Sequence, residues 1–274
     1  MKLLSLFLLS IFFICGCSTK EKHKKNSWTE LKLQGKVKSF KYIEYYPLDK
    51  TDKEVTNYTL FNDKGNMIES IDYYLDSSFK RKLTYKYDNQ GNLIEVNNYK
   101  PDSTFESKAI YKYDSKDNLI ELNLYKANDT LSDNASYFYD NKGNQIKIDW
   151  YEVDGHSKTK IIFKYDNQGN QTEEMEYNKT DSLLYKYTYK YNKQGNQIER
   201  YVYLTDSILA GKVIYKYDNQ GNQIVQCEYG PDGTPGSKIN YKFKYDSRNN
   251  WTQRTEIKYG QRDEIIARTI EYFE

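Results

Sequence analysis

The chain has very few of the residues on which nucleophilic or metal-dependent catalysis usually depends. Its 274 residues include two histidines and three cysteines. His23 lies in a polar stretch near the N-terminus and His156 lies in a predicted turn, so neither has a cysteine or serine partner at a plausible spacing. Acidic side chains are plentiful, but they recur in every copy of a repeat, whereas a catalytic carboxylate pair is needed only once. We therefore expect no enzymatic activity.

An excess of charge of one sign and long apolar runs are also missing. The 41 basic and 39 acidic side chains nearly balance, which gives no reason to expect a nucleic-acid partner. The longest apolar run, residues 3–14, would span about 18 Å as a helix, well short of the roughly 30 Å hydrocarbon core of a bilayer. Beyond this run we find no helical periodicity of useful length. The sequence therefore predicts neither a transmembrane helix nor a helical domain.

The N-terminus has the features of a secretory signal, with Lys2 before the apolar run and small residues after it. The four residues that end at Cys17 resemble the lipobox of bacterial lipoproteins, with an aliphatic residue at Ile14 and a small one at Gly16. The resemblance implies that residues 1–16 are removed, that the thiol of Cys17 receives diacylglycerol and that its amine is acylated. The alternative is an ordinary signal peptide in which Cys17 has no role.

Lipidation would attach the protein to a membrane through Cys17, since more than one acyl chain anchors a protein stably. The following residues, up to Ser27, are polar and mostly basic, which is typical of a solvated tether. Ser18 in place of Asp after the lipid cysteine resembles the signal for the outer membrane, on a side that the sequence leaves undetermined. Cys227 would then be the one unmodified cysteine of the mature chain, so no intrachain disulfide is expected.

A tandem repeat dominates the rest of the chain. Tyrosine recurs every 26 residues at Tyr73, Tyr99, Tyr125, Tyr151, Tyr177, Tyr203 and Tyr229. Such a period means that each unit is a supersecondary element that must pack against its neighbours. With 30 tyrosines and a mean hydropathy of −0.95, the core must be aromatic. Tyrosine favours strands and keeps a polar group, so a tyrosine-rich sheet can be amphipathic.

Each unit reads as strand, turn, strand, turn. The first turn carries Gly91 and Asn92 or their equivalents, and glycine and asparagine accept the positive φ of a tight turn. The second turn carries Asp102 and Ser103 or similar pairs. The sequence thus predicts antiparallel hairpins joined in series.

Covariation between copies indicates the strand register. Lysine at position 86 is matched by Glu95, whereas the copy with Phe138 in the lysine position carries Lys147 in the glutamate position. Opposite charges across an antiparallel pair are stabilising, so we expect Lys86 to face Glu95 across a four-residue loop, residues 89–92. In that register one face of the sheet is apolar and aromatic and the other is charged.

We therefore predict an all-β fold of tandem antiparallel β-hairpins forming one long twisted or curled meandering sheet. Seven units supply about fourteen strands, which would make a flat sheet on the order of 65 Å wide. The aromatic face must be covered by rolling of the sheet, by a second copy or by a partner. The domain is expected to span residues 28–274, with the atypical segments 28–57 and 251–274 capping its edges.

The pattern Tyr-x-Tyr-Asp-x-x-Gly-Asn, residues 85–92, resembles the YD repeats of Rhs-type proteins and insecticidal toxin shells. The resemblance spans residues 58–250 and implies a spiralling β-sheet. Large members of that family enclose a toxic domain and cleave themselves, but this chain has no cleavage segment that we can identify and too few units to close a comparable cage. Small lipid-anchored proteins of similar units are typical of Bacteroidota.

Two kinds of site can be weighed against structural roles. The turn at residues 88–92 offers oxygen ligands, but it lacks the alternating acidic residues of a calcium loop, so we expect turn chemistry, no metal and no cofactor. The tyrosines on the charged face are better candidates for ligand binding, although stacking against a lysine such as Lys82 would explain Tyr99 equally well. The candidate ligand-binding residues are Tyr99, Tyr125, Tyr151, Tyr177 and Tyr203.

Two functions fit these features. The first is a lipid-anchored cell-envelope protein that presents an extended β-sheet surface to a glycan, a peptide or an envelope protein. The second is a structural or self-associating envelope scaffold, or a fragment related to Rhs toxin shells. The first predicts an aromatic face open to solvent in the monomer, and the second predicts that this face is covered.

Overall fold

The computed structural model describes residues 26–45, 54–74, 76, 78–153, 158–205, 207–261 and 263–274. The expected signal peptide, Cys17 and most of the tether lie outside the described residues, as do both histidines. No helix in the described part of the chain is long and apolar enough to cross a membrane.

The described residues form one short helix, α2 (Ser27–Glu30), and eighteen β-strands. The strands are β1 (Val37–Tyr45), β2 (Glu54–Phe61), β3 (Met67–Tyr73), β4 (Phe79–Tyr87), β5 (Leu93–Tyr99), β6 (Phe105–Tyr113), β7 (Leu119–Lys126), β8 (Leu131–Tyr139), β9 (Gln145–Glu152), β10 (Lys158–Tyr165), β11 (Gln171–Tyr177), β12 (Leu183–Tyr191), β13 (Gln197–Leu204), β14 (Ile208–Tyr217), β15 (Gln223–Tyr229), β16 (Pro235–Tyr245), β17 (Trp251–Lys258) and β18 (Glu264–Tyr272).

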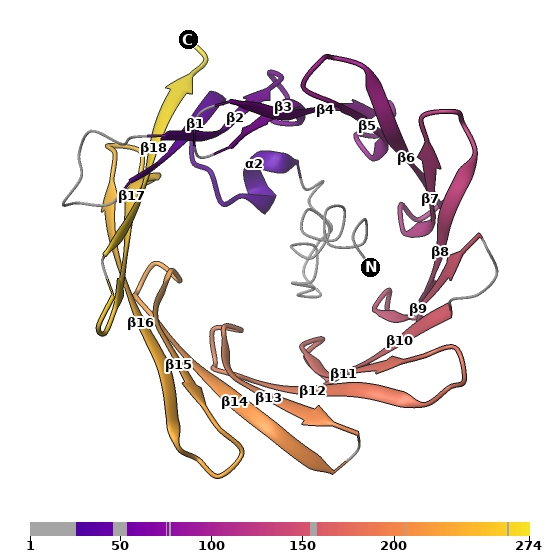
Figure 1. Cartoon of the computed structure of the whole chain (residues 1–274), viewed down its shortest axis with the longest axis vertical. Coiled ribbons are helices and arrows are strands. Elements are labelled where there is room, and N and C mark those ends of the chain that lie inside the picture. Colours follow the sequence, from indigo (N-terminus) through magenta and orange to yellow (C-terminus); the bar gives the residue numbers. More distant parts are fainter. Residues whose placement is uncertain are drawn as a thin grey trace.

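The strands close into an antiparallel barrel (Figure 1). Each strand pairs with its neighbours in sequence, and β1 pairs with β18 over a register that includes Phe40 opposite Ile270. The all-β prediction is confirmed, but the expectation of an open twisted or curled sheet is wrong. The sequence repeat describes contacts between consecutive units, whereas closure depends on two non-repeating segments more than 200 residues apart.

Hydrogen bonds also join the N-terminal and C-terminal segments where the barrel closes. Asn250, in the turn before β17, accepts a hydrogen bond from the backbone N–H of Gln34 at 2.7 Å and donates one to the carbonyl of Gln34 at 2.8 Å. The backbone N–H of Phe273 donates to the carbonyl of Lys36 at 2.9 Å. The segments predicted to cap the two edges of the array thus pair with each other, and no strand edge is left between β1 and β18.

The barrel tapers along its axis. In Figure 1 the turns that join β4 to β5, β6 to β7 and their equivalents lie nearer the centre than the turns at the other ends of the strands. Eighteen strands at the usual spacing make a ring about 27 Å across before strand tilt widens it, which is more than facing side chains can fill. The barrel therefore encloses a lumen with a narrow mouth and a wide mouth.

The turn at the narrow mouth is built by an aspartate and an asparagine. The backbone N–H and side-chain amide of Asn92 donate to the Asp88 carboxylate at 2.8 and 3.0 Å, and Gly91 has a φ of +87°. Lys86 pairs with Glu95 as predicted, but a bulge then brings Tyr87 opposite Leu93. The expected four-residue loop at 89–92 is therefore wrong, because the bulge leaves five residues, 88–92, between the strands.

A second recurrent feature links a hairpin to the previous one in five copies of the repeat. The Tyr87 hydroxyl donates to the carbonyl of Met67, twenty residues earlier, at 2.8 Å. The same contact, at 2.6 to 2.8 Å, joins Tyr113 to Leu93, Tyr139 to Leu119, Tyr165 to Gln145 and Tyr217 to Gln197. The Tyr-Asp pair of the motif thus has two structural tasks, since the tyrosine holds the neighbouring unit and the aspartate holds its own turn.

The position of α2 identifies the face that lines the lumen. The helix lies inside the ring in Figure 1, and Trp28 packs against Phe61 with ring centroids 6.5 Å apart, in a cluster that includes Val37 and Phe40. Paired residues share a face of the sheet. The pairs that continue from Phe40 along one face are Phe40–Thr59, Thr59–Ser70, Ser70–Leu83, Leu83–Asn98 and Asn98–Ser107. The predicted apolar and aromatic face is therefore the inner one.

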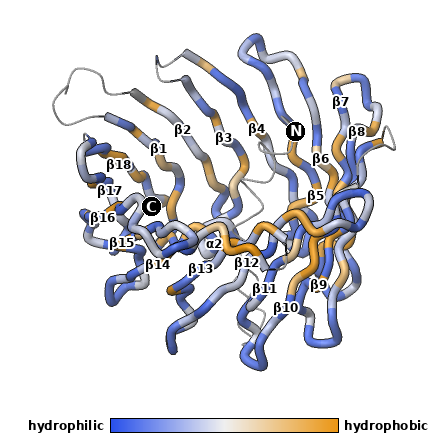
Figure 2. Tube along the Cα trace, turned by 60° about the horizontal axis from the view of Figure 1, so that its bottom comes forward, coloured by the Kyte–Doolittle hydropathy of each residue, from blue (hydrophilic) through white to orange (hydrophobic). Residues whose placement is uncertain are grey.

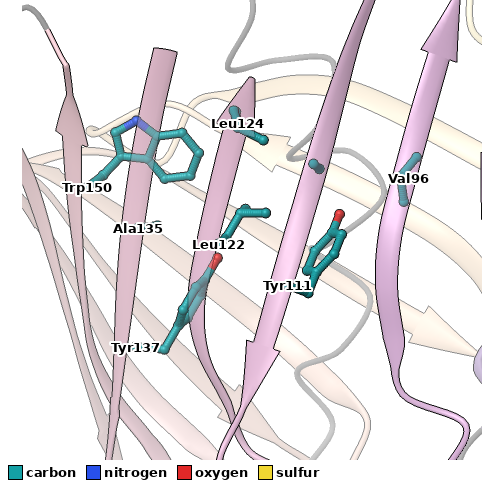
Figure 3. Packing of buried hydrophobic residues seen from close by; sticks show 8 residues of the cluster. Val96, Tyr111, Leu122, Leu124, Ala135, Tyr137 and Trp150 are labelled. Carbon is teal, nitrogen blue, oxygen red and sulfur yellow. The ribbon is translucent and has the colours of Figure 1, made fainter. Parts of the chain in front are cut away.

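The main core cluster occupies the inner face of strands β5 to β9 (Figure 3). Leu122, Ala109 and Ala135 have no exposed surface, and burial raises the pKa of the neighbouring Tyr111 and Tyr137 well above the ordinary value. Figure 2 shows hydrophobic residues concentrated in the strands and hydrophilic ones at the turns. Packing on this wall, together with the closed ladder of hydrogen bonds, holds this half of the barrel together.

Candidate functional site

The outer face carries a belt of ion pairs in the predicted register. Lys86 lies 2.6 Å from Glu95. The equivalent pairs are Lys112–Glu121 at 2.9 Å, Lys164–Glu173 at 2.9 Å and Lys190–Glu199 at 2.8 Å. Each lysine is more than half exposed, so each pair contributes little stability on its own. Because the pairs recur in four copies, charge is distributed around much of the outer surface.

In the copy that carries Phe138 and Lys147, a cation–π contact takes the place of the ion pair. Lys147 lies 3.9 Å from the ring centroid of Phe138 and forms an ion pair with Asp149 at 2.8 Å. The phenylalanine that replaces lysine in this copy thus still contacts the residue opposite it. This outcome confirms the inference that the two positions face each other.

Lysines stack on the tyrosines of the outer face. Lys82 lies 5.5 Å from the ring centroid of Tyr99. The same contact recurs for Lys108 over Tyr125 at 5.3 Å, Lys160 over Tyr177 at 4.6 Å and Lys212 over Tyr229 at 5.0 Å. Lys108 and Lys160 also pair with Asp129 and Asp181 in nearby turns. Three of the five predicted ligand-binding tyrosines therefore have a cationic partner within the barrel itself.

The other two predicted tyrosines also lie on the outer face. Tyr151 is 38% exposed and stands opposite Asn134, while Tyr203 stands opposite Lys186. The five tyrosines lie in separate repeats, so the structure does not gather them into one site. That they bind a ligand remains a prediction.

The inner wall is divided into two chemically different halves. Strands β5 to β9 carry the buried apolar cluster described above. Strands β11 to β17 carry ionisable and aromatic side chains on the same face, as their registers show. These inner-wall residues include Glu174, Glu176, Tyr185, Tyr187, Tyr189, Arg200, Tyr215, Glu228, Tyr241, Arg254 and Glu256.

Two glutamates stand one above the other on the inner face of β11. Glu174 pairs with Tyr187 across the strands and accepts hydrogen bonds from the hydroxyl of Tyr189 and the amide of Gln171, both at 3.0 Å. Burial raises the pKa of Glu174 above its ordinary value. Burial and the neighbouring Glu174 carboxylate raise the pKa of Glu176 in the same direction. Both groups are thus carboxylates for which a nearby cation would be favourable.

Aromatic rings lie beside these carboxylates. Tyr185 and Tyr187 stack with centroids 6.4 Å apart and an interplanar angle of 27°, and Tyr185 is 40% exposed. The guanidinium of Arg200 lies 6.0 Å from the ring of Tyr187, and its Nε has no hydrogen-bond partner among the described residues. This group of side chains was missed in the sequence. The signal was that Glu174 and Glu176 occupy positions where the copy at residues 93–99 has Val96 and Asn98.

Two surface hollows lie near the seam of the barrel. One, of about 210 Å³, opens on the inner face and is lined by Tyr42, Glu44, Thr56, Trp251, Arg254 and Ile266. A larger one, of about 710 Å³, lies on the outer face of β18 and β1 to β3. Within the described residues no three histidine, cysteine or acidic side chains form a group that could hold a metal ion.

Comparisons with known proteins assign no family. No protein-family model and no curated protein matches the chain. A porin-like protein from Bacteroides uniformis is 10% identical with a TM-score of 0.48, covering 86% of this chain and 96% of its own. A porin-like protein from Bacteroides vulgatus is 14% identical with a TM-score of 0.34, covering 86% and 99%. The Photorhabdus luminescens Tc holotoxin pore is 14% identical with a TM-score of 0.30, and 74% of this chain matches 14% of that chain.

At such low identities and TM-scores, these likenesses establish neither a family nor a function. Membership of the YD-repeat proteins therefore remains a prediction from the motif at residues 85–92. The chemistry of the two faces of the barrel is the firmer guide.

Proposed function

We propose that this chain is a lipid-anchored cell-envelope protein that stands in an aqueous compartment beside the outer membrane and binds a ligand on the inner wall of its barrel. The observation that carries the proposal is the distribution of side chains between the two faces. Ion pairs such as Lys86–Glu95 cover the outer face, while partly exposed aromatic and ionisable groups line β11 to β17 inside. A barrel that spans a membrane has the opposite distribution, with an apolar band outside.

The inner wall is the more suitable binding surface because it is concave and chemically mixed. Ligand sites are typically concave, with aromatic side chains and a few convergent polar groups. Tyr185 and Glu176 provide such groups, whereas Tyr99, Tyr125 and Tyr177 on the outer face are already stacked against lysines. The extended β-sheet surface expected from the sequence is in this proposal the inside of a closed barrel.

In this proposal the tether holds the narrow mouth toward the membrane. Helix α2 is fixed at that mouth, where the backbone N–H of Trp28 donates to the carbonyl of Gly65 at 3.1 Å and the Asn26 amide donates to the carbonyl of Lys64 at 2.7 Å. Eight residues, 18–25, separate Cys17 from this helix and its cap, and they reach at most about 28 Å. In this arrangement the wide mouth faces away from the bilayer.

The anchor is tested by replacing Cys17 with serine. We expect the parent chain to fractionate with membranes and to incorporate labelled fatty acid, and the Cys17→Ser chain to do neither. Membrane association of the Cys17→Ser chain would contradict a lipid anchor.

Access to the lumen is tested by thiol labelling in a Cys227→Ser background. Tyr185→Cys places a thiol on the inner wall, and Tyr151→Cys places a matched thiol of similar exposure on the outer face. We expect maleimides of small-ligand size to label both thiols, and maleimides attached to large polymers to label Tyr151→Cys far faster. If Tyr185→Cys resists even small reagents, the lumen is closed to ligands and the proposed function is wrong.

A further inference from the structure

On the inner face of β11 to β15, carboxylates differ from those on the outer face in the groups that hold them. Outer glutamates such as Glu121 pair with lysine. Inner Glu174 is held by a tyrosine hydroxyl and a glutamine amide, and Glu228 accepts from Gln226 at 3.1 Å and from Ser237 at 2.9 Å. These hydroxyl and amide donors are neutral, so they do not compensate the negative charge of the two carboxylates. Glu256 on β17 pairs with Arg254 at 2.8 Å, but Glu174, Glu176 and Glu228 have no direct ion pair among the described residues.

On this part of the inner wall, negatively charged side chains outnumber positively charged ones. Among the described inner-face positions of β11 to β15, three carboxylates, Glu174, Glu176 and Glu228, stand against one cation, Arg200. Arg200 lowers the pKa of Glu174, but burial outweighs that effect. The excess of negative charge favours a cationic ligand over a neutral or anionic one.

Tyrosine rings accompany each carboxylate. Tyr187 is opposite Glu174, Tyr185 is opposite Glu176, and Tyr215 is close enough to Glu228 that this carboxylate raises its pKa, after the larger effect of burial. Organic ammonium groups bind favourably to ring faces as well as to carboxylates. Rings and carboxylates together suit an organic ammonium better than a hard metal ion, which requires a cluster of oxygen ligands.

The carboxylates lie far apart along the wall. Glu174 and Glu176 are on β11 and Glu228 is on β15, four strand spacings away, which is about 19 Å along the sheet. A single small ammonium ion cannot contact both ends. An extended chain with several ammonium groups can.

We propose that the inner wall of β11 to β15 binds a linear polyamine, whose ammonium groups contact Glu174 and Glu176 at one end and Glu228 at the other, beside the tyrosines that face them. This inference rests on the proposed function, because it requires that the lumen admit a ligand. It adds the chemical class of that ligand and the residues that select it.

The test is calorimetric titration of the full chain, purified in detergent, with spermine at low and at moderate salt. We expect saturable binding that weakens as salt increases. The double variant Glu174→Gln/Glu176→Gln is expected to bind spermine at least about fivefold more weakly, because it removes two carboxylates that attract the ammonium groups. Arg200→Gln is expected to bind spermine about threefold more tightly, because it removes a cation that repels them. A shorter diamine, putrescine, is expected to bind more weakly than spermine.

The matched control is Glu173→Gln/Glu199→Gln, which removes two carboxylates from the outer face of β11 and β13. We expect this double variant to bind spermine like the parent chain. Absence of saturable binding, equal losses in the two double variants, unchanged affinity in Arg200→Gln, or binding of a lysine-rich peptide without binding of spermine would each overturn the proposal. If Tyr185→Cys is labelled by small reagents but spermine does not bind, the ligand class is wrong while the ligand-accessible lumen stands.

Discussion

The hydroxyl of Tyr113 donates a hydrogen bond to the backbone carbonyl of Leu93 at 2.8 Å, across the hairpin that separates them. The two residues belong to consecutive repeats, and the contact recurs with the same separation of twenty residues along the barrel. A tyrosine conserved through the repeat thus connects units that strand pairing joins only edge to edge.

Replacing Tyr113 with phenylalanine should destabilise the barrel by about 1 kcal/mol, since the ring remains and one partly buried hydrogen bond is lost. The free energy of unfolding can be measured by denaturant titration. Tyr125→Phe is the matched control, because Lys108 contacts the face of its ring and the ring is retained. Equal losses in the two variants would contradict the linking role of Tyr113.

Exchanging the charges of Lys112 and Glu121 should restore most of what either single reversal removes. Lys112→Glu alone places two like charges opposite each other and should cost a few tenths to about 1 kcal/mol. Adding Glu121→Lys re-forms the pair in reverse order. A double-mutant cycle in low salt measures the coupling, and a coupling energy of zero would show that the pair is only a geometric contact.

Gly143→Ala should destabilise the turn between β8 and β9 by about 1 kcal/mol through its backbone alone. Gly143 has a φ of +84°, and a Cβ added there would meet nothing within 4 Å, so the cost is that of the left-handed conformation. Gly143→Asn is the control and should cost less, because Asn249 occupies the same turn position in another copy with a φ of 61°. Denaturant unfolding of both variants decides the order.

The repeat allowed the local structure to be predicted well. Lys86 opposite Glu95 followed from the exchange of charge between copies, and the division into two faces followed from that register. The bulge at Tyr87 was missed because the pattern of Tyr87 and Leu93 is compatible with either turn length. The five-residue turn is closed by the hydrogen bond from the Asp88 backbone N–H to the Asn92 carbonyl and by that from the Asn92 backbone N–H to the Asp88 carboxylate. Neither contact changes the alternation of apolar and polar residues that the sequence shows.

Closure and the inner-wall site could not be read from the repeat, for different reasons. The pairing of Phe40 with Ile270 joins two segments that resemble neither each other nor the other units. The site around Glu174 depends on two positions whose residues vary between copies, with Val96 and Asn98 in one copy, Glu174 and Glu176 in another and Arg200 and Val202 in the next. A periodic pattern identifies what the copies share, whereas this site consists of residues in which they differ.

The two faces should respond oppositely to pH, which Glu174→Gln and Glu121→Gln can measure. Burial raises the pKa of Glu174, so the folded state holds its proton more tightly than the unfolded state, and its contribution to stability falls as pH rises above the ordinary glutamate value. Lys112 holds the pKa of Glu121 below that value, so its contribution is present at neutral pH and is lost as pH falls. As the pH rises from 4 to 7, the stability of Glu174→Gln relative to the parent chain should therefore increase. The relative stability of Glu121→Gln should decrease over the same change in pH. Denaturant unfolding at the two pH values tests both signs at once, and a shift of the same sign in both variants would mean that the inner carboxylate is as well compensated as the outer one.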